Sequence, residues 1–324
     1  MLFGLLAAFA VAVVATVLGS FVPIVGAPVF AIVIGTVIAA VRMPSAKLRP
    51  GIAFASRALL QWSIVLLGTN LSLREIAHGG AASLPVMLGT LVIVLALAWL
   101  VGRALGLDRD IRRLLGVGTA ICGGSAIAAL SSVIEAEQAD ISYALGAVFL
   151  FNVVAVLVFP ALGHLMHLSQ SAFGLWAGTA INDTSSVVAA AFAYGHAAGN
   201  SAVIVKLTRT TLIIPIVLFY AWRRIAEHRG KGTRINWRAI IPWFILWFLV
   251  AAVLNSLGVI PVALQKPLQE LALFAITIAL AGVGLGTDIV KIRSAGFRPL
   301  LLGAILWAAI ALSSLAIARF GHIA

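Results

Sequence analysis

Long apolar stretches alternate with short polar connections along the whole chain, and each stretch is long enough to cross ~30 Å of hydrocarbon as a helix. They lie near 2–19, 22–41, 56–72, 82–102, 113–134, 142–163, 170–193, 200–222, 238–256, 269–286 and 298–319. The pattern predicts an all-α polytopic membrane protein with about eleven transmembrane helices. The longest polar stretch, around 223–238, is too short for a soluble domain, so we expect residues 1–324 to form a single transmembrane transporter domain.

The composition agrees with this interpretation. Of 324 residues, 62% are hydrophobic and 10% charged, with a mean hydropathy of +1.14, whereas a soluble domain carries roughly a quarter charged residues. The net charge of +12 does not indicate a nucleic-acid partner, because most of the basic residues lie in four connecting segments. These residues are Arg42, Lys47, Arg49 and Arg57; Arg103, Arg109, Arg112 and Arg113; those from Arg223 to Arg238; and Lys291, Arg293 and Arg298.

The placement of these charges predicts a topology by the positive-inside rule. With Met1 in the cytoplasm, all four basic segments lie inside, and the segment with Glu135, Glu137 and Asp140 lies outside. We therefore expect a multi-pass protein of the cell inner membrane with a cytoplasmic N-terminus and a periplasmic C-terminus. The stretch 2–19 lacks a basic start and a cleavage site, so we interpret it as a retained span.

Two segments echo each other, Gly118-Thr-Ala-Ile-Cys-Gly-Gly-Ser-Ala and Gly178-Thr-Ala-Ile-Asn-Asp-Thr-Ser-Ser. Small and polar residues at membrane depth favour discontinuous helices, whose free backbone groups survive in lipid only where they line a protein cavity. The alternative is ordinary helix–helix contact through small residues. If both segments cross the membrane fully, they run in the same direction.

A second echo links Leu67-Gly68-Thr69-Asn70-Leu71 with Leu285-Gly286-Thr287-Asp288-Ile289. These motifs end spans that cross in opposite directions, as inverted-topology repeats require. The two echoes together do not fit one tandem duplication, so the repeat boundaries stay open.

Three ionisable residues lie deep within spans: Asp183, Lys206 and Arg209. At ~1.5 Å per residue, Asp183 and Arg209 reach comparable mid-membrane depths, where each needs a partner or water. One interpretation is an Asp183–Arg209 ion pair. That pair leaves Lys206 as surplus positive charge on the same helix face, which suits an anionic solute. Lys206 could instead extend toward the outer interface.

Helix starts near Ser125 and Thr184 would add free N–H groups and partial positive charge to this site. The candidate substrate-binding residues are Cys122, Gly123, Gly124, Ser125, Asn182, Asp183, Thr184, Ser185, Ser186, Lys206, Arg209 and Thr210. Protonation of Asp183 would free Arg209 for the substrate, so proton coupling is a hypothesis. The single cysteine excludes a disulfide framework or a cysteine metal site, and we expect no cofactor and no catalytic residue.

Four motifs of the chain carry a family resemblance: Gly118–Ala126, Asp183-Thr-Ser-Ser-Val-Val-Ala-Ala, Lys206-Leu-Thr-Arg209 and the Leu-Gly-Thr element near the end. On these motifs the chain resembles the YeiH-like sulfate exporter family of bacterial inner-membrane proteins. The resemblance implies a secondary transporter related to the bile acid, arsenite and riboflavin transporter group, with inverted repeats and crossing broken helices. Many members have a His before the Asp, where this chain has Asn182, so a proton relay through that His does not carry over.

The leading functional interpretation is a secondary transporter that exports sulfate or a related small inorganic or organic anion across the lipid bilayer. An anion channel is the first alternative. An intramembrane aspartyl protease is the second, and it needs a facing pair of Asp residues. ATP-driven pumping is disfavoured because the chain has no Gly-x-x-x-x-Gly-Lys loop. The coupling ion, proton or sodium, and a homodimeric assembly stay open.

Overall fold

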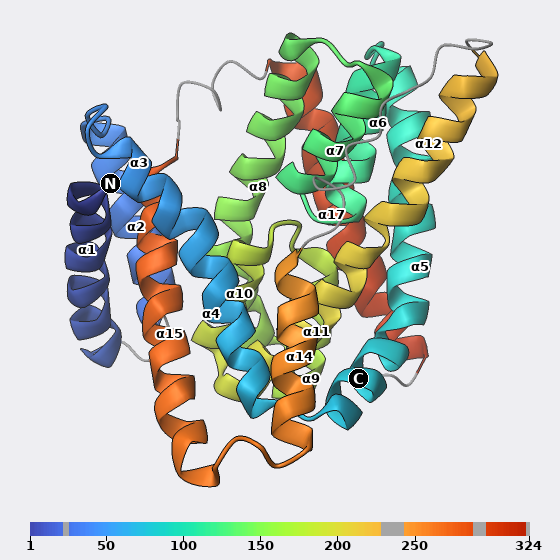
Figure 1. The fold of residues 1–324 in the computed structure, drawn as a ribbon. Coiled ribbons are helices and arrows are strands. Elements are labelled where there is room, and N and C mark those ends of the chain that lie inside the picture. The colour runs from blue at the N-terminus through green and yellow to red at the C-terminus, as the bar shows by residue number, and fades with distance from the viewer. Residues whose placement is uncertain (22–25, 228–242, 288–295, 322–324) are drawn as a thin grey trace.

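A computed structural model describes residues 1–21, 26–227, 243–287 and 296–321, and confirms an all-α membrane protein (Figure 1). The helices are α1 (Leu2–Phe21), α2 (Gly26–Val41), α3 (Arg49–Ala53), η1 (Phe54–Leu59), α4 (Leu60–Leu67), η2 (Gly68–Asn70), α5 (Leu73–Ala104), α6 (Arg109–Ala120), α7 (Gly124–Ile134), α8 (Gln138–Leu165), α9 (Gln170–Ala180), α10 (Thr184–Tyr194), α11 (His196–Thr211), α12 (Ile213–Glu227), α14 (Trp243–Ser256), α15 (Val262–Leu285) and α17 (Phe297–Phe320). In this part of the chain, seven helical segments are long and apolar enough to cross a membrane, and shorter apolar helices accompany them.

Local sequence explains where several helices begin and end. Ser72 starts α5 with a capping box, in which its hydroxyl accepts from the backbone N–H of Glu75 while the Glu75 carboxylate accepts from the backbone N–H of Ser72. Pro215 has no N–H to donate to the carbonyl four residues earlier, which accounts for the break between α11 and α12 near Leu212. Residues 49–70 form one continuous rod from α3 to η2 with a π-helical stretch at Phe54–Leu59.

The helices form two bundles. The peripheral bundle contains α1, α2, the α3–α4 rod, α14 and α15; α1, α2 and α15 lie on the left of Figure 1 and α14 lies near its centre. Glycines let its backbones approach closely, since a Cβ at Gly284 would lie 2.4 Å from the Ile32 carbonyl oxygen. The central bundle contains α5 to α12 and α17, and α2 against α10 is the main contact between the two bundles.

The segments predicted as spans 113–134 and 170–193 do not cross the molecule; each folds back as a helical hairpin. In α6–α7, a Cβ at Gly118 would lie 2.8 Å from the Ile127 Cγ1, although residues nine apart in one helix are separated by ~13 Å. The carboxylates of Asp108 and Asp110, at the start of α6, also interact electrostatically with Asp140, at the start of α8. The hairpin therefore begins and ends at the same end of the molecule.

The α9–α10 hairpin reverses in the same way at the other end. The Gln170 Oε1, at the start of α9, accepts from the backbone N–H groups of Ala197 and Ala198, at the start of α11 (3.0 and 3.2 Å). The Tyr194 hydroxyl, at the end of α10, donates to the Leu168 carbonyl. Figure 1 shows α6–α7 in the upper half and α9–α10 in the lower half, so the two hairpins enter from opposite ends.

This geometry corrects three expectations. Glu135, Glu137 and Asp140 lie at the same end as the basic residues of 103–113, and not at the other end. The two Gly-Thr-Ala-Ile segments run in opposite directions and so form an inverted pair. The broken helices meet at their tips and do not cross.

Two further topology predictions agree with the structure. The α3–α4 rod and α15 run in opposite directions, because Gly282, near the end of α15, lies against Ala55, near the start of the rod. The start of α1 lies against Gly51, and it is in the upper half of Figure 1 whereas the end of α17 is in the lower half. Asp288, Lys291, Arg293 and most of the basic segment 223–238 lie outside the described residues.

Candidate functional site

The two hairpin tips, 121–123 and 181–183, touch each other. A Cβ added at Gly123 would lie 3.7 Å from the carbonyl carbon of Asn182 and 3.7 Å from the Cα of Asp183. Gly123 has φ +67 and ψ −124, a backbone conformation that side chains with a Cβ rarely adopt. The glycine therefore permits both the reversal of the first hairpin and its contact with the second.

The tips meet near the middle of the membrane. The helices that lead to them have 12 residues (α6) and 11 residues (α9), or ~18 and ~16 Å at 1.5 Å per residue. Together these lengths match the ~30 Å thickness of the hydrocarbon core. Asp183 and Arg209 lie at comparable heights, as predicted, because Asp183 is in one tip and Arg209 binds carbonyls next to both tips.

Two cations of α11, Lys206 and Arg209, bind backbone carbonyls at the C-terminal end of the first helix of each hairpin. The Lys206 Nζ donates to the Ile121 and Ile181 carbonyls, at 2.9 and 3.0 Å. The side chains of Lys206 and Arg209 are both fully buried (0% exposed). The Lys206 side chain therefore points into the protein and not toward the outer interface.

Arg209 extends the same arrangement one turn along α11. Its Nε donates to the Ala120 carbonyl at 2.8 Å and its Nη2 to the Thr119 carbonyl at 2.7 Å, while Nη1 donates to the Thr179 carbonyl. These oxygens belong to the last turns of α6 and α9, where helix carbonyls lack intrahelical partners and carry partial negative charge. Lys206 and Arg209 thus join the two inverted hairpins.

Asp183 does not pair with Arg209. Its Oδ2 accepts from the Ser185 backbone N–H at 2.9 Å and from the Ser185 hydroxyl, so the carboxylate caps the start of α10. Its backbone N–H donates to the Asn152 Oδ1 of α8 at 3.2 Å. The ion pair considered from the sequence is therefore absent between these two described residues.

The starts of α7 and α10 differ in their caps. Gly123 supplies no side-chain cap to α7. The backbone N–H of Ala126 donates to the Cys122 sulfur, whereas those of Gly124 and Ser125 have no acceptor among the described residues. Ser125 is exposed, and Gly124, Asp183 and Thr184 are partly exposed. Because polar groups at this depth cannot face hydrocarbon, this side of the tips faces water or protein.

The remaining predicted residues also gather at the tips. The hydroxyls of Ser125, Thr184 and Ser186 have no hydrogen bond within the described chain, whereas Thr210 donates to the Lys206 carbonyl at 2.8 Å, within its own helix. Cys122 and Asn182 are buried. The structure thus brings the predicted residues together at the tips. These are residues 122–125 and 182–186, Lys206 and Arg209. The Thr210 hydroxyl is hydrogen-bonded within α11 itself.

The fixed charges of this place leave it positive. Two helix C-termini contribute about one negative charge, and two helix N-termini contribute about one positive charge. Two cations and the carboxylate of Asp183 add a further unit of positive charge. A net charge of about +1 at mid-membrane favours a small anion.

Asn152, in the middle of α8, is a further residue of the site that was not among those predicted from the sequence, and it is 3% exposed. Its Nδ2, like the Oδ1 of Asn182, is buried with no hydrogen-bond partner among the described residues. A lone Asn at the centre of the apolar stretch 142–163 is the signal that could have indicated it, since such residues in membrane spans mark polar contacts. Buried polar groups without partners are rare in native proteins, so these two amide groups are part of the candidate site.

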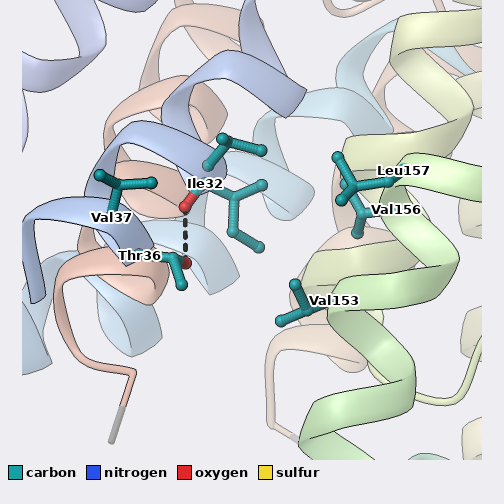
Figure 2. Close-up of a pocket in the computed structure, with 7 residues that line it drawn as sticks. Ile32, Thr36, Val37, Val153, Val156 and Leu157 are labelled. Atoms are coloured by element: carbon teal, nitrogen blue, oxygen red, sulfur yellow. Dashed lines mark hydrogen bonds between the residues drawn. The ribbon is translucent and has the colours of Figure 1, made fainter. Parts of the chain in front are cut away.

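An apolar groove separates the two bundles beside this helix. Its cavity volume is about 100 Å³, and it lies between α2 and α8 (Figure 2). Ile32, Val33, Thr36, Val37, Val153, Val156 and Leu157 line it. The Thr36 hydroxyl donates to the Ile32 carbonyl (Figure 2), so the groove offers no free polar group from this residue.

Comparisons with known proteins support the resemblance stated from the motifs. The model of a family described as conserved hypothetical protein 698 matches residues 3–303. The chain is 43% identical to a UPF0324 membrane protein of Streptococcus pneumoniae over 96% of this chain and 95% of the relative. It is 38% identical to one of Clostridium tetani (94% and 92%) and 40% identical to one of Fusobacterium nucleatum (98% and 97%). No solved structure matches the chain.

Proposed function

The chain belongs to the family of conserved hypothetical protein 698, the YeiH-like family, and from that premise we propose that it is a secondary transporter of small anions. The expected substrate is sulfate or a related oxyanion or sulfonate, exported across the bacterial inner membrane by alternating access. The observation that carries the proposal is the contact of two inverted hairpin tips at mid-depth, with Lys206 and Arg209 bound to both.

The direct ligands in this proposal are hydrogen-bond donors on the accessible side of the tips. The uncapped start of α7 offers backbone N–H groups, and Ser125 and Thr184 offer hydroxyls that have no partner within the described chain. Lys206 uses two of its three N–H donors, and Arg209 uses three of its five. Both side chains are fully buried behind the tips, so they would stabilise an oxyanion through their charge and by holding the two hairpins together.

Alternating access is favoured over a channel by the two-bundle architecture. The tips belong to one bundle, and the second bundle contacts it mainly through α2 against α10. Paired elements of opposite direction around one mid-membrane site are typical of transporters that rock or slide one unit against another. In this mechanism the central bundle carries the site past the peripheral bundle.

An intramembrane aspartyl protease receives less support than a transporter. It would need a second Asp facing Asp183, whose carboxylate binds Ser185. The other candidate aspartate, Asp288, lies outside the described residues. For orientation we propose that the end with Met1 and the basic segments faces the cytoplasm, by the positive-inside rule.

Counterflow in proteoliposomes tests the function. Vesicles loaded with unlabelled sulfate, sulfite or a small sulfonate should accumulate the labelled anion transiently, as a transporter does and a channel does not. Ser125→Ala should weaken apparent affinity by roughly fivefold, as expected for one hydrogen bond of ~1 kcal/mol. Ser132→Ala is the matched control, because that exposed serine of α7 donates to the Ala128 carbonyl. Absence of counterflow with every one of these anions would reject the proposed substrate class.

A further inference from the structure

The ammonium group of Lys206 occupies a position between two helix C-termini that approach it from opposite ends of the molecule. Its two acceptors, the carbonyls of Ile121 and Ile181, belong to the residues that follow the last helical residues of α6 and α9. Each C-terminus carries about half a negative charge. The single positive charge of Lys206 therefore balances the two helix ends.

In ion-coupled transporters, unwound carbonyls and half-helix C-termini of this kind coordinate the coupling cation. In this protein, side chains of α11 donate hydrogen bonds to these carbonyls. Arg209 binds those of Thr119, Ala120 and Thr179, and Lys206 binds those of Ile121 and Ile181. Both side chains are fully buried, so a free cation would have to displace one of them.

We propose that Lys206 is a tethered substitute for a coupling cation, and that this protein carries its anion without binding sodium. The inference rests on the proposed transport function and deepens it, because it excludes sodium as the coupling ion. The amino group that donates to the two helix ends is part of the chain, so it neither arrives with the substrate nor leaves with it.

Removal of this charge should create the cation site that the side chain fills. Lys206→Ala leaves the Ile121 and Ile181 carbonyls without their donor, between two partially negative helix ends. Sodium, which needs oxygen ligands only, could then occupy the vacated space. The change converts a sodium-independent protein into one that sodium stabilises by linkage to folding.

The experiment measures thermal stability of the purified protein in detergent, in sodium chloride and in choline chloride of equal ionic strength. The wild type should melt at the same temperature in both salts. Lys206→Ala should melt lower in choline, and sodium should raise its melting temperature by a few degrees in a saturable way. Lys266→Ala, which removes an exposed lysine of α15, should behave as the wild type does in both salts.

Saturable stabilisation of the wild type by sodium would overturn the inference, and so would a Lys206→Ala protein that folds and ignores sodium. If Lys206→Ala does not fold, Lys206→Gln replaces it, because this variant removes the charge and keeps an amide NH2 group as donor. The comparison of the wild type in the two salts needs no variant. The readout requires no substrate. Failure of anion counterflow with a sodium-indifferent wild type would therefore count against the proposed function alone.

Discussion

Replacement of Arg209 by Met should separate the two hairpins and destabilise the whole protein. Arg209→Met keeps an unbranched side chain but removes the donors to the carbonyls of Thr119, Ala120 and Thr179. Hydrogen bonds from charged groups contribute about 1.5–3 kcal/mol each in soluble proteins, whereas side-chain hydrogen bonds inside membranes average ~0.6 kcal/mol. Three bonds between these bounds predict a loss of about 2–9 kcal/mol.

Lys206→Met removes two such bonds, so about two thirds of that loss is expected. The matched control is Thr208→Val on the same helix. The Thr208 hydroxyl donates only to the Ile204 carbonyl within α11, at 2.9 Å, and its loss should cost under about 1 kcal/mol.

Fluorescence-detected size exclusion after heating ranks the three variants against the wild type. The expected order of stability is wild type close to Thr208→Val, then Lys206→Met, then Arg209→Met. An Arg209→Met protein that survives heating as well as Thr208→Val would refute the conclusion that this guanidinium joins the hairpins.

Two other predictions concern the tips. Gly123→Ala should lower stability by about 1–3 kcal/mol, because its backbone conformation (φ +67) disfavours a Cβ. The neighbouring Gly124→Ala, whose Cβ would meet Leu145 at an ordinary 3.5 Å, should be nearly neutral; equal melting temperatures for the two variants would contradict this account. Asn152→Leu should cost about 1–3 kcal/mol because the partly buried Asp183 N–H loses its acceptor, and unchanged heat resistance would show that this contact is unimportant.

Much of the site could be predicted from the sequence because charge in an apolar stretch is conspicuous. Lys206 and Arg209 stand out for that reason, and their spacing places them on one helix face. Their partners could not be predicted, since backbone carbonyls carry no sequence signature. The sequence therefore suggested Asp183 as the partner of Arg209, whereas a local cap on α10 satisfies this carboxylate.

The hairpins could not be distinguished from crossing helices by the length of their apolar stretches. Two helices of about eleven residues with a three-residue tip span as many residues as one crossing helix. Only tertiary contacts, such as those of Gln170 with Ala197 and Ala198, show that the chain returns. The sequence pattern predicted each hairpin as one crossing helix. Two such errors leave the parity of the crossings unchanged, so the opposite placement of the two chain ends was still predicted.

Single-cysteine labelling measures whether each hairpin returns to the side of the membrane from which it enters. Cys122, the one cysteine of the chain, is first replaced by Ala, and cysteines are then placed one at a time at Gly106, Glu137, Ser169 and Ala197, all exposed positions at the hairpin bases. A membrane-impermeant maleimide added to one side should label Gly106→Cys and Glu137→Cys alike, and Ser169→Cys and Ala197→Cys only from the other side. Labelling of Gly106→Cys and Glu137→Cys from opposite sides would show that α6–α7 crosses the membrane and would contradict the account.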